Sequence, residues 1–230
     1  MLKYKTSHFK NSVLFLFAIF WFTQINAGKL QFEAGFRIPV THSAGVEYWF
    51  NKWLSVSFHG NILTNPYKKA FIDILEINDK NKVLANTIGE AFSFGLELQP
   101  AVKYWYKNYY FSLYYSNFSL LAKDSPLNVI KNYYQVNIPD ILYFTGSDIS
   151  LNTTLNNIGI SFGRLFNTKI PHLIIKTGLS LSKCFESHSK MDGMSLLTSI
   201  LNHEIDRELS PYLVRSGYIP SINIYFVYEL

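Results

Sequence analysis

The sequence has a single cysteine, Cys184, among its 230 residues. One thiol excludes an internal disulfide, and we expect Cys184 to be an incidental loop residue without a redox or catalytic role. Charged residues make up only 16% of the chain. The lysines and arginines form no cluster of the kind that nucleic-acid-binding faces carry, so we expect no nucleic-acid partner. A glycine-rich phosphate loop is also missing, and we expect no cofactor.

Long hydrophobic runs are missing too. The longest, residues 13–22 (VLFLFAIFWF), is far shorter than the roughly 20 residues that a membrane-spanning helix needs. The mean hydropathy of +0.06 is too low for a helical membrane protein. It suits a membrane β-barrel, in which only alternate residues face lipid.

The apolar run belongs to a predicted signal peptide, residues 1–27. Lys3, Lys5 and Lys10 precede the run without an acidic residue, and residues 24–27 (QINA) offer a cleavage site after Ala27. This order is typical of a secretory leader, and the alternative is an uncleaved anchor. Three of the 21 basic residues and none of the 16 acidic ones lie in the leader, so the mature chain carries 18 against 16, a net charge of +2.

Residues 45–62 (GVEYWFNKWLSVSFHGNI) show most clearly what the sequence does contain. Apolar and polar residues alternate on both sides of Asn51-Lys52, which predicts a β-hairpin with a two-residue turn. Trp49, Phe50 and Trp53 surround this turn. Aromatic rings at strand ends are typical of a membrane–water interface, because amphipathic rings settle at headgroup level.

The same alternation recurs to the C-terminus and predicts eight strands. They lie at residues 28–38, in the two arms of the 45–62 hairpin, and at 91–103, 109–120, 155–166, 170–182 and 222–230. Tight turns are expected at 51–52, 107–108 and 167–169, a short connection at 39–42, and long loops at 62–90, 121–153 and 184–217. A chain that enters a barrel from the periplasm has every second connection outside the cell, which explains the alternation of turns and loops. An even strand number lets the first and last strands pair and removes the open edge.

Three local features refine this prediction. Pro100 lacks an N–H and marks a candidate bulge in the fourth strand. Residues 71–77 form an apolar patch inside the first long loop. In the third loop, five apolar residues are spaced for one face of a helix over the barrel mouth: Met194, Leu196, Leu197, Ile200 and Leu201.

The leader, the alternation, the turn and loop pattern and the last strand resemble the small eight-stranded outer-membrane barrels of the OmpA/OmpX type, over residues 28–230. The last strand resembles the family's assembly signal, with apolar residues at alternate positions: Ile222, Ile224, Phe226, Tyr228 and Leu230. Family members usually end on an aromatic residue, whereas this chain ends on Leu230.

The resemblance implies an all-β fold, an eight-stranded antiparallel up-and-down transmembrane β-barrel in the outer membrane of a Gram-negative cell. A monomer is expected, in contact with outer-membrane lipid and lipopolysaccharide. The barrel-assembly machinery is expected to recognise the last strand, and an unknown extracellular partner is expected to bind the loops.

Alternation places seven titratable residues on the inward face of the predicted barrel: Glu33, Arg37, Glu47, His59, Glu97, Lys103 and Lys176. Eight strands enclose just enough room for side chains to fill the lumen, and buried charges must pair. We therefore expect a polar network that fills the lumen, and the alternative is an ion pathway through a narrow pore. The expected function is structural or surface interaction through the long loops, because loops are where such function concentrates.

An enzymatic alternative rests on Ser57, His59 and Glu47. Outer-membrane lipid A deacylases resemble serine hydrolases, in which a base and a carboxylate must lie within reach of the nucleophile. The deacylase pattern is His-x-Ser-Asn, whereas this chain has Ser-x-His followed by Gly60-Asn61, and its Ser57 and His59 point inward. A soluble secreted barrel of the lipocalin type is the remaining alternative.

His188 and the pair His203-Glu204 lie in the third predicted loop. A metal site needs more ligands at a defined spacing. We therefore expect solvated loop residues here and no metal.

Overall fold

The computed structural model describes residues 28–64, 94–122, 150–192, 206–207 and 210–230. Several sequence predictions lie outside these residues. They are the signal peptide at 1–27, the apolar patch at 71–77, the helical stripe at 194–201 and the pair His203-Glu204.

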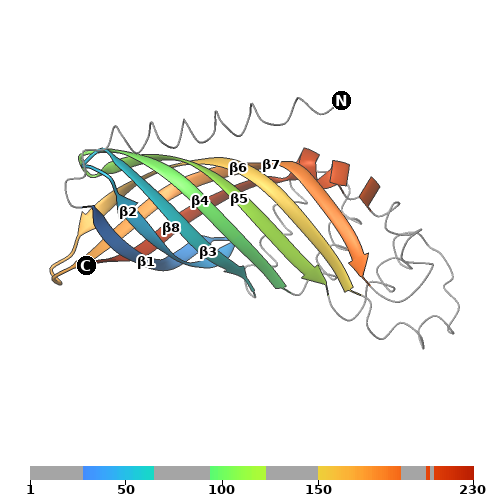
Figure 1. Ribbon diagram of the computed structural model, residues 1–230, viewed down its shortest axis with the longest axis horizontal. Helices are drawn as coiled ribbons and strands as arrows, with labels where there is room; N and C mark the ends of the chain where they lie inside the picture. Colours follow the sequence, from blue (N-terminus) through green and yellow to red (C-terminus); the bar gives the residue numbers. More distant parts are fainter. Residues whose placement is uncertain (1–27, 65–93, 123–149, 193–205, 208–209) are drawn as a thin grey trace, which may run out of the picture.

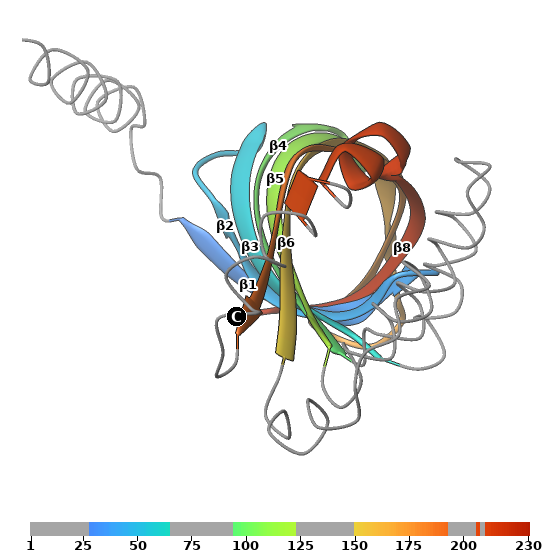
Figure 2. The ribbon, with the colours of Figure 1, turned by 90° about the vertical axis from the view of Figure 1, so that its right-hand side faces the viewer.

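The described residues form eight antiparallel strands in a closed barrel, which confirms the predicted fold class. Each strand pairs with the next along the chain, and β8 returns to pair with β1. Figure 1 shows the barrel from the side and Figure 2 shows it from one end. The strands are β1 (Lys29–Ile38), β2 (Thr41–Trp49), β3 (Leu54–Leu63), β4 (Phe94–Tyr106), β5 (Tyr109–Ala122), β6 (Ser150–Asn167), β7 (Leu173–Asp192) and β8 (Tyr218–Glu229).

The barrel has two unlike ends. The connections at residues 50–53, 107–108 and 168–172 lie at the end that also holds the C-terminus, on the left of Figure 1. We call it the turn end, and the opposite end the far end. The predicted two-residue turn at Asn51-Lys52 is wrong in length, because four residues join β2 to β3. The side-chain Oδ1 of Asn51 accepts hydrogen bonds from the backbone N–H groups of Trp53 and Leu54, and this cap holds the longer turn.

Several strands reach further toward the far end than the sequence predicted. β7 continues to Asp192, into a segment that we expected to be a loop, so Cys184 and His188 are strand residues and the loop prediction for them is wrong. β6 begins at Ser150 and β8 at Tyr218, also earlier than predicted. The extensions of β6 and β7 pair with each other, as in Thr153 with Ser189. Because their residues are mostly polar, local sequence did not distinguish them from loops.

The predicted bulge at Pro100 is also wrong. Pro100 pairs with Phe58 of β3 in an unbroken ladder, and the β4–β5 pairs on both sides of it keep one register. The register shift lies instead between Asn156 and Asn157, opposite β7. One extra residue in β7 there changes which side chains face inward beyond this point.

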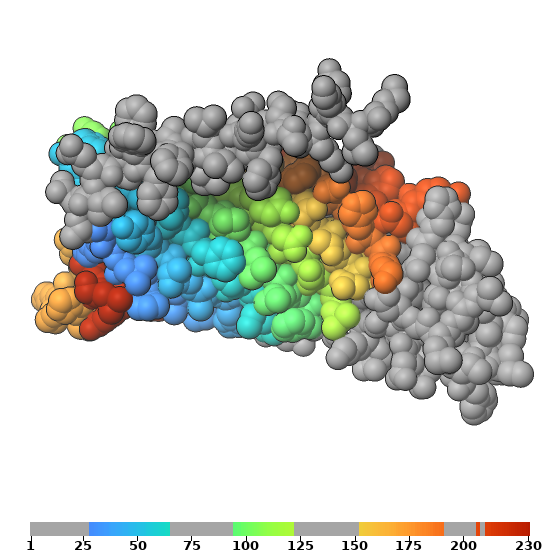
Figure 3. All heavy atoms as spheres, in the orientation of Figure 1, coloured from blue at the N-terminus to red at the C-terminus, as the bar shows by residue number. Residues whose placement is uncertain are grey.

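The barrel reverses the usual burial pattern of a globular protein. Between the turn end and the middle of the strands, large apolar side chains cover the outside, such as Leu113, Phe162 and Leu179, each of which is more than half exposed. Polar side chains point inward and are buried, such as Ser112 and Ser161. Figure 3 shows the outside, where the strands cross the surface as tilted bands of colour.

On β5 and β6 this pattern changes toward the far end. On β5 the outward residues Phe111, Leu113 and Tyr115 are followed by Asn117 and Ser119. On β6 the outward isoleucines 158 and 160 give way to Asn156, Thr154 and Asn152. The inward face toward the far end holds buried polar side chains such as Thr153 and Ser189, together with four buried apolar ones: Leu63, Phe118, Leu120 and Leu155. The outward faces of β5 and β6 therefore change from apolar to polar at Asn117 and Asn156.

A short helix at residues 210–216 packs against the extended part of β7. Its Ser210 hydroxyl donates to the carbonyl oxygen of Ser187 (2.6 Å), and Asp206 accepts from the backbone N–H of Ser189 (2.7 Å). Leu213 of the helix is buried. The helix thus lies over the inward face of the β7 extension at the far end (Figure 2). Within the described residues, no helix is long and apolar enough to cross a membrane.

Glycines on β6 make room for tyrosines of the neighbouring strand β5, whose rings lie over β6 inside the barrel. A Cβ atom at Gly159 would overlap the ring of Tyr114, and one at Gly163 would lie 2.5 Å from Cε1 of Tyr110. Both approaches are far closer than van der Waals contact. Small residues on the inward face of β6 therefore complement large ones on the inward face of β5.

Gly159→Ala should consequently lower the free energy of unfolding by about 1–3 kcal/mol through overpacking. Urea titration of the folded barrel measures this. Gly60→Ala is the matched control, because a Cβ there meets only the Ala44 carbonyl oxygen at 4.0 Å. Adding Tyr114→Leu to Gly159→Ala should recover stability. If Gly159→Ala and Gly60→Ala unfold at the same urea concentration, Tyr114 does not pack as described.

Candidate functional site: the ion-pair network in the lumen

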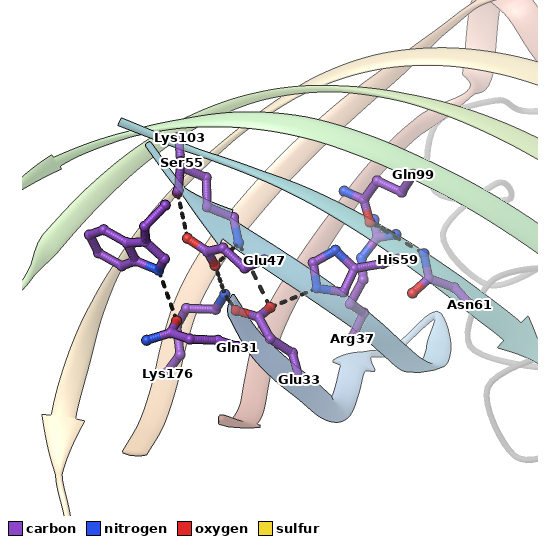
Figure 4. A network of polar contacts seen from close by, with 11 residues as sticks. Gln31, Glu33, Arg37, Glu47, Ser55, His59, Asn61, Gln99, Lys103 and Lys176 are labelled. Carbon is purple, nitrogen blue, oxygen red and sulfur yellow. Dashed lines mark hydrogen bonds and ion pairs between the residues drawn. The ribbon is translucent and has the colours of Figure 1, made fainter. Parts of the chain in front are cut away.

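Four charged side chains from four strands meet inside the barrel near the turn end. Lys103 of β4 lies 2.6 Å from Glu47 of β2 and 3.7 Å from Glu33 of β1. Lys176 of β7 pairs with Glu33 and lies 3.0 Å from Glu47. All four are buried. Each lysine therefore contacts both carboxylates, and the two positive and two negative charges balance (Figure 4).

His59 and Ser55 of β3 complete this cluster. The Nε2 atom of His59 lies 2.7 Å from Glu33. Ser55 donates to Glu47 (2.5 Å) and accepts a hydrogen bond from the indole N–H of Trp105 (2.7 Å). Each carboxylate is thus held by a second polar side chain as well as by lysines, which a buried ion pair requires if it is to be stable.

Arg37 forms a second cluster, one step closer to the far end. It lies 2.5 Å from Glu97 of β4 and donates to the amide oxygen of Gln99 (3.0 Å). Asn61 of β3 donates to Glu97 as well (3.0 Å). The guanidinium carbon of Arg37 is 5.7 Å from the ring centre of Tyr114 on β5. The side chain of Arg37 therefore reaches from β1 across to the opposite wall.

Aromatic rings fill the remaining cross-section. The Tyr110 ring of β5 faces both lysines, with its centre 5.7 Å from Lys176 Nζ and 5.9 Å from Lys103 Nζ. The ring centre of Tyr225 on β8 lies 5.2 Å from Lys176 Nζ and 5.3 Å from that of His59, on which it stacks. With Gly163 of β6 against Tyr110, every strand contributes to this one level of the lumen.

A stacked pair of tryptophans lies beside the ionic cluster, closer to the turn end. The rings of Trp49 and Trp105 are 4.5 Å apart between centres. Trp49 donates to Gln31, and Gln31 donates to Glu229. Side chains thus cross the lumen at three successive levels.

All seven titratable residues that the sequence placed inside the barrel lie there, in these two clusters. The sequence reasoning missed the neutral partners that complete them: Gln31, Ser55, Asn61, Gln99, Tyr110, Tyr114 and Tyr225. Strand position was a usable signal for them. Four of them, Gln31, Ser55, Asn61 and Gln99, lie an even number of residues from a titratable residue that was predicted to face inward on the same strand. The three tyrosines lie on the polar face of strands whose alternation is clear.

The structure does not bring together Ser57, His59 and Glu47, the residues of the enzymatic alternative. Ser57 and His59 both point inward, and His59 pairs with Glu33 while Glu47 binds Ser55 and the two lysines. Among the described residues, no hydrogen-bond partner of the Ser57 hydroxyl is present. A serine hydrolase needs its histidine beside the serine and a carboxylate behind the histidine. This arrangement instead uses His59 as a partner of a buried carboxylate.

The remaining candidates lie outside the lumen or at its far end. His188 is on the outward face of β7, 3.2 Å from Glu186. The hydrogen bond from Asn156, and then that from His188, lowers the pKa of the exposed Glu186 carboxyl. Cys184 is a buried strand residue whose thiol donates to the Glu186 carbonyl oxygen (3.2 Å). No group of three or more metal-ligating side chains occurs in the part of the chain that the structure describes.

Comparison with known proteins gives few matches. No protein-family model matches the chain, and no curated protein does. Among solved structures, the chain is similar to a major outer membrane protein from Thermus thermophilus, with a TM-score of 0.47 and 13% sequence identity over 89% of this chain and 100% of that one. The closed eight-stranded barrel described above is established by the strand pairing of this chain itself.

Proposed function

We propose that this protein is a transmembrane β-barrel of an outer membrane, with a sealed lumen and a structural or surface-interaction role. The observation that carries the proposal is the inversion of polarity along β5 and β6. Apolar residues face outward up to Tyr115 and Ile158, and polar residues face outward beyond Asn117 and Asn156. In a soluble barrel of the lipocalin type, water surrounds the whole outer face, so the outward side chains are not expected to change from apolar to polar in the middle of a strand. A barrel that leaves a bilayer at this level must do so.

Closure of the sheet supports the same proposal. A bilayer core offers no hydrogen-bond partner to an open strand edge, and the pairing of β1 with β8 removes the edge. Lipid and lipopolysaccharide would contact the outward apolar face. The last strand, β8, would be the segment that the barrel-assembly machinery recognises, and residues 1–27 would be the leader that directs export.

The filled lumen favours a structural role over a pore. Ion pairs and aromatic rings from seven of the eight strands cross the lumen at the level of Lys103 and Lys176, and Gly163 of β6 makes room for the Tyr110 ring. An ion would have to displace a balanced, buried network to pass. The lipid-modifying alternative has less support, because His59 is buried and paired with Glu33. The role in binding would then belong to the segments that join the strands at the far end, and their partner would be extracellular.

A planar-bilayer experiment tests both parts of the proposal. The protein should insert from detergent into the bilayer and should give no steady single-channel steps, because the network closes the lumen. Folding should require detergent or lipid, with the folded and heat-unfolded forms migrating differently on a gel. A protein that stays monodisperse in buffer without detergent would contradict the membrane assignment. Steady conductance steps would contradict the sealed lumen alone.

A further inference from the structure

The outside of the turn end carries aromatic rings and positive charges together. Six exposed aromatic side chains lie there: Trp53, Tyr104, Tyr106, Tyr109, Phe166 and Tyr228. Four exposed cations lie among them, Lys52, Lys107, Arg164 and Lys169. We call these ten residues the cationic girdle.

Three of the cations rest on rings of the girdle. Lys52 Nζ lies 5.0 Å from the ring centre of Trp53, and Lys107 Nζ lies 5.5 Å from that of Tyr106. The guanidinium carbon of Arg164 lies 5.1 Å from the ring centres of both Tyr109 and Phe166. Cation–π contacts of this kind fix where a cation sits. The charges are thereby held at the level of the rings and do not extend freely into solvent.

Carboxylate side chains are scarce around the girdle. Glu229 is the one carboxylate side chain among the described residues at this rim, and it pairs with Lys29. Within the described residues, none of the four girdle cations forms an ion pair. The other rim of the apolar surface differs, because Glu186 and His188 pair there beside Lys183.

We infer that the cationic girdle binds the phosphate groups of anionic phospholipids in the leaflet at the turn end. The inference rests on the proposed function, since it requires the apolar face to lie in a bilayer. Aromatic rings settle at headgroup level, which puts the four cations where lipid phosphates are. Each lysine or arginine near an anionic surface adds attraction, and charges on a fixed girdle lose little freedom when they bind. The turn end therefore selects anionic over zwitterionic lipid.

Quenching of Trp53 fluorescence by brominated lipids tests this inference. Trp53 lies in the girdle and is 42% exposed, whereas Trp105 is 1% exposed and stacks on Trp49 inside the barrel. The protein is isolated from the membrane of the expressing bacterium and placed in two kinds of vesicle. One kind mixes brominated phosphatidylglycerol with unlabelled phosphatidylcholine, and the other mixes unlabelled phosphatidylglycerol with brominated phosphatidylcholine. Relative quenching gives a binding constant for one lipid over the other. We expect a preference for the anionic lipid of about threefold or more, given the attraction per cation.

Substitution of the cations should remove the preference. Lys52→Gln, Lys107→Gln and Arg164→Gln together should bring the relative binding constant to about one, because the attraction that each cation adds is gone. Lys183→Gln is the matched control. Its Nζ also lies over a tyrosine ring, 4.8 Å from the centre of Tyr218, but outside the girdle, so the preference should remain.

A salt titration of the unchanged protein gives an independent readout that needs no variant. In 1 M salt the screening length falls to about 3 Å, and the preference should fall with it. Equal quenching by both lipids at low salt, or a preference that survives the triple substitution or high salt, would overturn the inference. Absence of quenching by either lipid would instead overturn the membrane assignment itself, so the two failures are distinguishable.

Discussion

Lys176→Met should lower the free energy of unfolding of the barrel by about 3–5 kcal/mol, the cost of removing one partner of a buried ion pair. The side chain of Lys176 is almost wholly buried and contacts both Glu33 and Glu47. Without it, two carboxylates share the single charge of Lys103, and water cannot solvate the excess charge in the closed lumen. Urea titration of the folded protein in detergent, followed by tryptophan fluorescence and gel migration, measures the loss.

Two further variants isolate the cause of this effect. Lys183→Met makes the same substitution on the outward face of the same strand, where the lysine is exposed, and should change stability little. Glu33→Gln added to Lys176→Met removes the excess charge and should restore part of the stability, because removal of both partners costs less than removal of one. If Lys176→Met unfolds at the same urea concentration as the wild-type protein, the network does not stabilise the barrel.

Leu113→Arg should lower the free energy of unfolding in lipid by about 2–4 kcal/mol, the cost of an arginine at the bilayer midplane on a barrel surface. Leu113 lies halfway along the outward apolar run of β5, between Tyr109 at the turn end and Asn117 at the polarity change. Its side chain points outward and is 52% exposed, so the substitution leaves the packing of the lumen intact. Unfolding in urea from vesicles of neutral lipid measures the cost.

An arginine substitution at a second site separates the effect of depth in the bilayer from the effect of introducing an arginine at all. Tyr106→Arg places the same side chain on the outward face at the turn end, where the cost should be about 0–1 kcal/mol. The difference between the two variants reports the position of the membrane along β4 and β5. Equal costs at both positions, or a gain in stability for Leu113→Arg, would mean that hydrocarbon does not surround the barrel.

Much of the fold could be predicted because the alternation of side chains is local. Strands such as β1 and β5 have apolar and polar residues at period two, and one face of a sheet follows from that period alone. The same rule placed Glu33, Lys103 and Lys176 inside. It failed for the extension of β7, where Glu186 and His188 face outward and polar residues such as Ser187 also face inward. A strand that is polar on both faces has no alternation to detect.

In the strands with clear alternation, the sequence by itself determined which side chains face the lumen and which face outward, because that depends only on residue type and on the period of a strand. The tertiary structure alone decided which charges pair. Lys176 is 143 residues from Glu33 and 129 from Glu47, and Lys103 is 56 from Glu47. The pairing of β8 with β1 closes the barrel and so brings Lys176 of β7 close to Glu33 and Glu47. Lys103 of β4 reaches the same two carboxylates from the other side of the lumen. Such contacts depend on the register and curvature of the whole barrel, which no local pattern encodes.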